Sequence, residues 1–279
     1  MNFERACLRR IVRLALVEDR VDRDVTTDSL REYDGLASAR VIAKATGVIS
    51  GLEAFVETFR MIDPAVVVRI DRADGSEVRP GEVIAEIEGK QSSILKAERT
   101  ALNFLQHLSG VATLTRRFVE KMKPSPAVLL DTRKTTPGLR YLEKKAVRDG
   151  NGSNHRLNLE QMALIKDNHI EMAGSIAAAG GAGRMKHPGK GIEVEVRTLD
   201  ELRQALAIGV EMIMLDNFDF ALIGKAVGMA EKKAKLEISG NVDLNHVGAL
   251  ASSGVDFISV GVLTHSAPAL DISLKISGK

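Results

Sequence analysis

After residue 125 the sequence repeats one pattern, in which a short apolar run ends in polar residues and a helical segment follows. The runs are Val128–Leu130, Ala163–Ile165, Ile192–Glu195, Ile213–Leu215, Leu236–Ile238 and Phe257–Val260. Between them, Thr198 and Glu201 have the spacing of a helix capping box, and residues 243–254 also have a helical pattern. Strands that alternate with helices predict a parallel sheet, and six or seven such units in series predict an α/β barrel short of eight strands.

The first half of the chain has a different pattern. Residues 3–18 carry apolar side chains at helical spacing, and residues 37–90 are rich in strand-like runs with turn signals between them. We expect an antiparallel sheet there. Residues 93–122 are helical in pattern, and we interpret Ser109-Gly110 as a junction between two helices and as the domain boundary.

Charge is concentrated in one part of the chain. The chain has 39 basic and 37 acidic residues and a net charge of +2, but residues 131–156 alone hold seven basic and three acidic residues. Aromatic residues make up 4% and tryptophan is absent, which argues against a base-stacking surface for nucleic acid. A compact site for a small phosphorylated or carboxylated ligand fits this pattern better.

The apolar runs, the N-terminal charges and the cysteine content indicate in which compartment the protein is expected. No apolar run reaches the ~18 residues that a membrane span needs, so we expect no membrane partner. Arg9 and Arg10 also argue against the apolar core of a signal peptide. Cys7 is the only cysteine and cannot form an internal disulfide, so we expect a cytoplasmic protein.

Two basic motifs are candidate anion sites. In Asp131–Gly138, Arg133 offers a two-donor fork for a carboxylate or phosphate, and Lys134 offers a point charge. In Gly150–Arg156, backbone amides beside glycines can approach a ligand, and His155 and Arg156 can contact a second anion. The alternative is an ordinary basic surface loop.

Acidic residues end two nearby strands of the predicted barrel. Glu195 and Asp216 lie 21 positions apart, and their carboxylates are expected above the same end of the barrel. They suit Mg²⁺ held jointly with substrate phosphates, or the stabilisation of positive charge on a sugar. The alternative is a pair of buried structural carboxylates. Glu193 shares the face of Glu195 by strand alternation, so one of these two is a candidate for a structural role.

Other strand ends complete the candidate site. Lys166 is a candidate anion ligand. Ser239, Gly240 and Gly261 end the last two strands, where α/β barrels often bind phosphate, and His265 is close enough in sequence to assist. The alternative for the glycines is a simple turn. The sequence has no P-loop, dinucleotide-binding glycine motif, zinc cluster or nucleophile-elbow motif.

Taken together, these motifs resemble those of the quinolinate phosphoribosyltransferase family, whose members are type II phosphoribosyltransferases. The matching stretches, in order, are Glu98–Gly110, Asp131–Gly138, Asn154–Arg156, Lys166–His169, Glu193–Glu195, Leu215–Asn217, Ser259–Gly261 and Leu263–Ser266. The resemblance implies Mg²⁺-dependent transfer of phosphoribose from 5-phosphoribosyl-1-pyrophosphate to quinolinate, with decarboxylation. The products would be nicotinate mononucleotide, pyrophosphate and CO₂, which serve NAD biosynthesis.

The resemblance also implies an architecture. Residues 1–110 would form an N-terminal α/β sandwich, and residues 111–266 an incomplete α/β barrel of about seven strands. The tail at 267–279 would pack on the N-terminal domain. The protein would be a homo-oligomer, at least a dimer, in which two subunits share each active site.

The family's functional residues carry over by motif. Arg133, His155 and Arg156 would bind the quinolinate carboxylates, together with Arg99 from the partner subunit. Lys134 and Lys166 would lie between the dicarboxylate and the pyrophosphate, and Glu195 and Asp216 on the Mg²⁺ and ribose side. Ser239, Gly240 and Gly261 would bind the 5-phosphate, with His265 nearby. The chain departs from the family pattern at Asn151, within a glycine-rich loop, and at Arg23, where a glycine is common.

Two other interpretations remain open at this point. Relatives that use nicotinate, or that are associated with molybdenum uptake, share parts of the scaffold, but the His155-Arg156 pair favours a dicarboxylate acceptor. A non-catalytic sensor of phosphorylated metabolites or an RNA-binding barrel is also conceivable. The low aromatic content and the pair of Glu195 and Asp216 argue against it.

Overall fold

The computed structural model describes residues 3–278, with side chains described from residue 6 to residue 277, and it divides into two compact units. The first unit contains the residues up to Arg116, Thr135–Asn151 and the residues from Leu263 onward. The second unit contains Arg117–Lys134 and Gly152–Val262. Within the described residues, no helix is long and apolar enough to cross a membrane.

The first unit is built on a four-stranded antiparallel sheet with the strand order β12-β1-β5-β3. The strands are β1 (Leu36–Ala43), β3 (Val67–Ile70), β5 (Val83–Lys90) and β12 (Ile272–Gly278). Two short strands, β2 (Gly47–Val48) and β4 (Glu77–Val78), form a separate antiparallel pair. This confirms the antiparallel sheet expected from residues 37–90.

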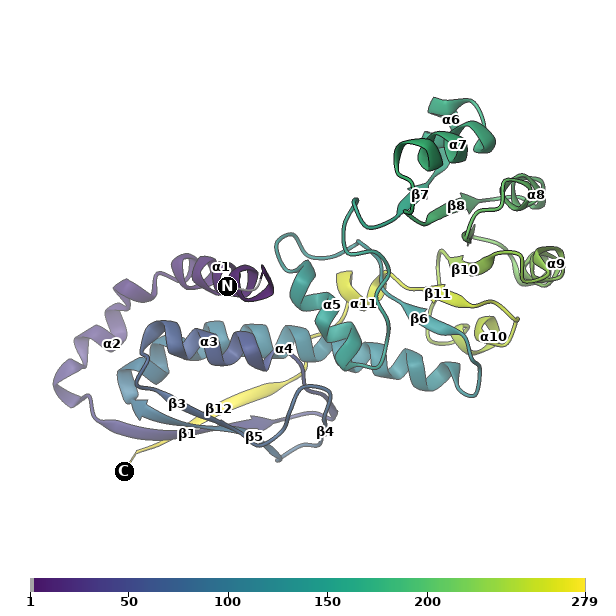
Figure 1. Ribbon diagram of the computed structural model, residues 1–279. Coiled ribbons are helices and arrows are strands. Elements are labelled where there is room, and N and C mark those ends of the chain that lie inside the picture. The colour runs from purple at the N-terminus through teal and green to yellow at the C-terminus, as the bar shows by residue number, and fades with distance from the viewer. Residues whose placement is uncertain (1–2, 279) are drawn as a thin grey trace. The chain divides into compact units, whose positions relative to one another are not determined.

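Two helices, α3 (Leu52–Ile62) and α4 (Gln91–Met122), lie on one face of this sheet (Figure 1). Small side chains of β1, such as Ala37 and Ala39, are buried in the same core as Ile94 and Ala97 of α4. Small residues on the sheet let a helix approach closely, which explains the alternation of buried alanines along β1. The result is the α/β sandwich that the family resemblance implies.

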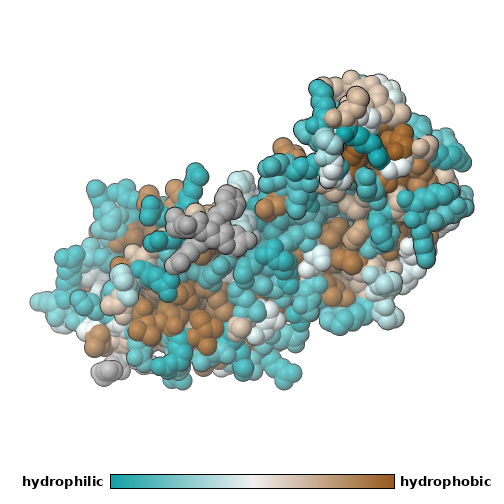
Figure 2. All heavy atoms as spheres, viewed as in Figure 1, coloured by the Kyte–Doolittle hydropathy of each residue, from teal (hydrophilic) through white to brown (hydrophobic). Residues whose placement is uncertain are grey.

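The exposed surface of the first unit is partly apolar. Figure 2 shows apolar side chains gathered over the part of this unit that contains α4 and β3. Val67 and Ile70 of the edge strand β3 and Leu95 of α4 are exposed. Polar side chains cover much of the rest of this face.

Among the described residues, the first unit contains four further helices, of which α1 is the longest. They are α1 (Phe3–Glu18), α2 (Val25–Ser29), α5 (Arg140–Asp149) and α11 (Val262–His265), with 3₁₀ turns at Val21–Arg23 and Arg31–Tyr33. Helix α1 confirms the prediction for residues 3–18. Asp24 caps α2 by accepting hydrogen bonds from the backbone N–H groups of Thr26 and Thr27.

Two expectations for this part of the chain are wrong. Helix α3 lies within the segment interpreted as strand-rich, because its apolar residues Leu52, Phe55 and Phe59 were not recognised as one helical face. Helix α4 also continues without a break through Ser109-Gly110, where a junction was expected. The hydroxyl of Ser109 accepts a hydrogen bond from the backbone N–H of Ser50 at 3.0 Å. A Cβ on Gly110 would lie 2.2 Å from the carbonyl oxygen of Pro268, so this small pair permits close packing of other segments against a continuous helix.

The second unit is a parallel sheet of six strands with the order β6-β11-β10-β9-β8-β7. Its strands are β6 (Val128–Leu130), β7 (Ala163–Ile165), β8 (Ile192–Val196), β9 (Met212–Asp216), β10 (Lys235–Ser239) and β11 (Phe257–Ser259). Each coincides with one of the six predicted runs, so the incomplete α/β barrel is confirmed. A single parallel bridge between Leu130 and Ser153 continues the sheet beyond β6 in place of a further full strand.

Helices connect these strands and lie on the outer side of the sheet (Figure 1). They are α6 (Asp167–Ala173), α7 (Ile176–Lys186), α8 (Leu199–Ala207), α9 (Phe220–Ala230) and α10 (Val247–Ala251). The predicted cap of α8 is confirmed, since the hydroxyl of Thr198 accepts the backbone N–H of Glu201 at 3.1 Å. Helix α10 is shorter than the predicted 243–254, because Asp243 binds the backbone N–H groups of Asn245 and His246 in a turn before the helix.

Candidate functional site

A cavity of about 590 Å³ lies at the carboxyl ends of the parallel strands of the second unit. It brings together nine of the twelve predicted site residues: Arg133, Lys134, His155, Arg156, Lys166, Glu195, Asp216, Ser239 and Gly240. Its other lining residues are Thr132, Leu164, Met214, Asn217, Glu237, Asn241 and Ser259. A second cavity of about 620 Å³ lies in the first unit between α1, α4 and residues 136–139, and none of the twelve predicted site residues lines it. The charged cavity is therefore the candidate site.

One side of the candidate site is cationic. Arg133 and Lys134 follow β6, and Arg156 follows the single-residue bridge at Ser153. Burial lowers the pKa of Arg156 from its ordinary value, and the nearby charge of Arg133 lowers it further. Two guanidinium groups that line one cavity repel each other, and an anion bound between them would offset this repulsion. This arrangement suits a ligand with more than one carboxylate or phosphate.

Two carboxylates from neighbouring strands also line the cavity. Glu195 lies near the end of β8, and Asp216 ends β9, which pairs with β8 in parallel. Lys166 forms an ion pair with Glu195, and the Nε of Arg197 lies 3.6 Å from a carboxylate oxygen of Asp216. Both acids are thus held by cations at the edge of the cavity.

The turn after β10 requires a glycine. Gly240 has φ of +97°, in the region that favours glycine, and a Cβ there would lie 2.2 Å from the Oδ1 of Asn217. The side chain of Asn241 donates a hydrogen bond to that same oxygen at 3.2 Å. Ser239 ends β10 beside Asp216 in the strand register. Ser239, Gly240 and Asn241 of this turn line the cavity.

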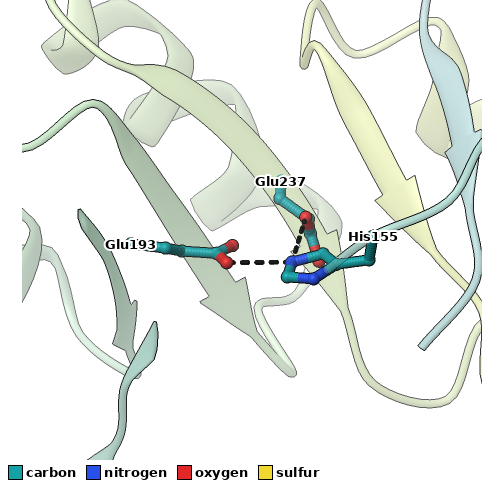
Figure 3. Close-up of side chains that lie close together, drawn as sticks. All are labelled: His155, Glu193 and Glu237. Atoms are coloured by element: carbon teal, nitrogen blue, oxygen red, sulfur yellow. Dashed lines mark hydrogen bonds and ion pairs between the residues drawn. The ribbon is translucent and has the colours of Figure 1, made fainter. Parts of the chain in front are cut away.

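Beneath the cavity lies a buried group of one histidine and two glutamates (Figure 3). The Nε2 of His155 lies 2.9 Å from Glu193 on β8 and 3.5 Å from Glu237 on β10. Burial raises the pKa of each glutamate to about 8, and for Glu237 the charge of Glu193 adds to the effect. Both carboxyl groups are therefore largely protonated at neutral pH.

Sequence reasoning missed some residues of the cavity. Glu237 went unassigned within its apolar strand run, although an acid in a buried strand of a barrel is itself a signal. Asn217 and Asn241 also went unassigned. Their left-handed backbone conformations, with φ of 54° and 48°, could have been anticipated from the tolerance of asparagine for turns that end a strand.

Three predicted site residues do not line this cavity. Arg99 is exposed on α4 in the first unit, Gly261 follows β11, and the ring of the exposed His265 is hydrogen-bonded to Ser266 at 2.6 Å. Lys145, in the same basic stretch of the sequence, binds Asp74 and Asp149 of the first unit.

Neighbouring Lys144 is almost fully buried.

Gly150 packs against α4, since a Cβ there would lie 2.5 Å from the carbonyl oxygen of Ala112. That contact explains why position 150 is a glycine.

The fold and the cavity together define a class of protein: α/β-barrel enzymes that bind anionic substrates at the carboxyl ends of the strands. Comparison with known proteins narrows this class. The family models "Quinolinate phosphoribosyl transferase, N-terminal domain" and "C-terminal domain" match residues 24–109 and 111–275. The chain therefore belongs to the quinolinate phosphoribosyl transferase family.

Individual relatives agree with this assignment. A probable carboxylating nicotinate-nucleotide pyrophosphorylase of Bacillus subtilis is 38% identical over 97% of this chain and 93% of its own length. A second, from Synechocystis, is 43% identical over 85% of this chain and 82% of its own length. The solved nicotinate-nucleotide pyrophosphorylase of Francisella tularensis is 41% identical, with a TM-score of 0.94 over 98% of this chain and 96% of that one.

Proposed function

We propose that this protein is a carboxylating nicotinate-nucleotide pyrophosphorylase, which joins quinolinate to 5-phosphoribosyl-1-pyrophosphate with loss of CO₂. The products are nicotinate mononucleotide, pyrophosphate and CO₂, and the reaction belongs to NAD biosynthesis. The observation that carries the proposal is one cavity lined by two guanidinium groups, Arg133 and Arg156, and by the carboxylates of Glu195 and Asp216. Such a site can hold a dicarboxylate beside a developing sugar cation.

The dicarboxylate binds at the cationic side. Arg133 and Arg156 each offer a planar fork of N–H donors, which matches the two oxygens of a carboxylate. Quinolinate carries two adjacent carboxylates, so the pair supplies one guanidinium to each. Nicotinate carries one carboxylate and would engage only one of these two guanidinium groups, so we expect the site to favour quinolinate over nicotinate.

The phosphoribosyl donor occupies the rest of the cavity. Ser239 and Gly240 bind its 5-phosphate through the hydroxyl and the backbone N–H groups of the turn, and Gly261 contributes from the next strand end. Lys134 and Lys166 bind the pyrophosphate and keep it close to the dicarboxylate. Two polyanionic substrates repel each other, and these lysines offset that repulsion.

The reaction needs no side-chain nucleophile. The ring nitrogen of quinolinate forms a bond to C1 of the ribose, while the bond from C1 to the pyrophosphate oxygen breaks and its electron pair leaves with pyrophosphate. Glu195 and Asp216 stabilise the positive charge that develops on the ribose. The bond from the ring to the adjacent carboxyl group then breaks and releases CO₂. Its electron pair remains on the ring carbon, stabilised by the pyridinium nitrogen, until that carbon takes a proton.

Mg²⁺ is the cofactor that we propose for the donor side. Carboxylate oxygens are its preferred protein ligands, and Glu195 and Asp216 present such oxygens from adjacent strand ends, so the residues fit the ion. When bound there with the substrate phosphates, Mg²⁺ would neutralise part of the pyrophosphate charge.

A second subunit completes the site in this proposal. Arg99 is exposed on α4 and does not line the cavity, so we propose that it reaches the dicarboxylate of a second copy of this chain in a homodimer or larger assembly. Mixing inactive Arg99→Ala and Lys134→Ala proteins should then restore about a quarter of the wild-type activity, because half of the dimers are hybrids with one intact site. Failure of every mixture to recover activity would contradict a shared site. The single cysteine suits the cytoplasm, where we place the reaction.

The test is substrate discrimination by the purified protein. The protein is incubated with 5-phosphoribosyl-1-pyrophosphate, Mg²⁺ and either quinolinate or nicotinate, while nucleotide and CO₂ are measured. We expect both products from quinolinate and no nucleotide from nicotinate. Turnover of nicotinate alone would refute the dicarboxylate assignment, and no turnover of either would refute the proposed function.

A further inference from the structure

Both ring nitrogens of His155 take part in hydrogen bonds within the chain. Its Nδ1 accepts the backbone N–H of Arg156 at 2.8 Å. A backbone N–H is always a donor, so Nδ1 carries no proton and the single ring proton of the neutral imidazole is on Nε2. That Nε2–H points at the carboxyl group of Glu193, 2.9 Å away (Figure 3). Both ring nitrogens thus have partners within the chain, and the side chain of His155 is only 6% exposed.

The main chain around His155 is fixed by a second buried acid. Asp131 is fully buried, and one of its oxygens accepts the backbone N–H of His155 at 2.9 Å. Its other oxygen accepts the side-chain N–H of Asn154 at 2.7 Å. The residues before Arg156 are therefore held by Asp131, and the ring of His155 is held by Glu193.

Arg156 itself depends on this framework. Its backbone N–H is bound by the ring of His155, and its guanidinium donates a hydrogen bond to the carbonyl oxygen of Met162 at 3.0 Å. Arg156 lines the cavity together with Arg133. A rotation of the His155 ring would remove the partner of the Arg156 N–H and shift the guanidinium away from this place.

We propose that Glu193 is a positioning residue, which acts through the ring of His155 to place the guanidinium of Arg156 for binding the dicarboxylate. Glu237 lies farther from the ring, at 3.5 Å, and closes the other side of the pocket around it. The inference rests on the proposed function, since it specifies how one end of that site is built.

The role depends on a hydrogen-bond acceptor at position 193, which suggests a matched pair of variants. In Glu193→Gln the amide oxygen can still accept the Nε2–H of His155. In Glu193→Leu the volume is similar, but position 193 offers no acceptor, and only the more distant Glu237, 3.5 Å from Nε2, remains near the ring proton. We expect the KM for quinolinate to rise about tenfold in Glu193→Leu and by less than about threefold in Glu193→Gln. The KM for 5-phosphoribosyl-1-pyrophosphate should change by less than about twofold in both.

A double-mutant cycle tests whether the effect passes through Arg156. In an Arg156→Ala background the guanidinium to be positioned is gone, so adding Glu193→Leu should change quinolinate affinity by less than about twofold. Quinolinate affinity is measured by calorimetry in all four proteins, so the comparison does not require turnover. A full tenfold loss in both backgrounds would refute the positioning role, as would an equal rise in the KM for both substrates.

Stability needs its own control. Glu57 is a buried glutamate of α3 in the first unit, where it forms an ion pair with Arg9 at 2.9 Å. Glu57→Leu should lower the thermal midpoint while leaving both KM values unchanged. If Glu193→Leu does not fold, His155→Gln in the same cycle takes its place, because one amide group cannot bridge Glu193 and the Arg156 N–H.

The cycle also separates the two proposals. Absence of turnover by the wild-type protein refutes the proposed function and, with it, the positioning role. Normal turnover by the wild type, with unchanged quinolinate affinity in Glu193→Leu, refutes the positioning role alone.

Discussion

Replacement of Gly240 by alanine tests the turn that we propose for binding the 5-phosphate. Its φ of +97° costs a residue with a Cβ about 1–2 kcal/mol. The new Cβ would also lie 2.2 Å from the Oδ1 of Asn217, so that side chain must swing away and lose its hydrogen bond with Asn241. That loss costs about another 1 kcal/mol. We expect a total destabilisation of about 2–3 kcal/mol and a thermal midpoint lower by roughly 5–10 °C.

The same substitution should weaken donor binding selectively. The displaced Asn217 side chain and the distorted turn lie in the cavity, so we expect the KM for 5-phosphoribosyl-1-pyrophosphate to rise about tenfold, equivalent to about 1.4 kcal/mol. The KM for quinolinate should change by less than about twofold. Steady-state kinetics with each substrate varied in turn measures both values.

Gly209→Ala provides the matched control. Gly209 also has a positive φ, +65°, but no atom lies within 4 Å of the Cβ position, and the residue follows α8 away from the cavity. We expect Gly209→Ala to lower the unfolding free energy by about 1–2 kcal/mol through backbone strain, without any change in the KM of either substrate. If Gly240→Ala kept the wild-type KM for the donor, or if Gly209→Ala raised it equally, the assignment of the turn would be refuted.

Three further predictions concern other parts of the site. Arg133→Ala should weaken quinolinate binding at least a hundredfold by calorimetry, because a fork of donors to a carboxylate is lost from the cavity; near-normal affinity would disprove that role. Chelation of divalent cations should abolish turnover. Glu195→Gln should raise the Mg²⁺ concentration for half-maximal rate at least tenfold, and an unchanged Mg²⁺ concentration would contradict the role of Glu195 as a Mg²⁺ ligand. The pKa of Glu237 is raised to about 8 against an ordinary 4.5, so the folded state holds a proton that the unfolded state releases. The unfolding free energy should therefore fall as pH rises from about 4.5 to about 8, and Glu237→Gln should flatten that slope in denaturant titrations; an unaltered slope would contradict this reading.

Much of the second unit could be predicted from sequence, because its strands are buried on both sides. All five residues of β8 are buried, and such strands appear as short apolar runs that polar residues end. Polar residues at the ends of parallel strands meet at one edge of the sheet. The same pattern therefore predicted that Lys166, Glu195 and Asp216 line one cavity, as they do. In this unit, the position of a polar residue at the end of an apolar run is enough to predict that it lies at the cavity.

The errors arise where tertiary packing decides the structure. Ser109-Gly110 has the composition of a turn, but the hydroxyl of Ser109 binds the chain at Ser50 and the missing Cβ of Gly110 admits Pro268. Both partners are distant in sequence, so no local rule reveals them. The same holds for Glu237, whose role depends on His155 and Glu193, each from a different strand or loop.

The pairing of β12 with β1 also sets the timing of folding. Strand β1 at Leu36–Ala43 has β12 at Ile272–Gly278 as one of its two neighbours, more than two hundred residues later in the chain. At a synthesis rate of about 5–20 residues per second, the ribosome needs roughly 10–50 seconds to make the intervening segment. During that time one edge of β1 has unpaired backbone groups and is open to the strands of other nascent chains. Chaperone demand during synthesis should therefore fall on the first unit, although its residues emerge first.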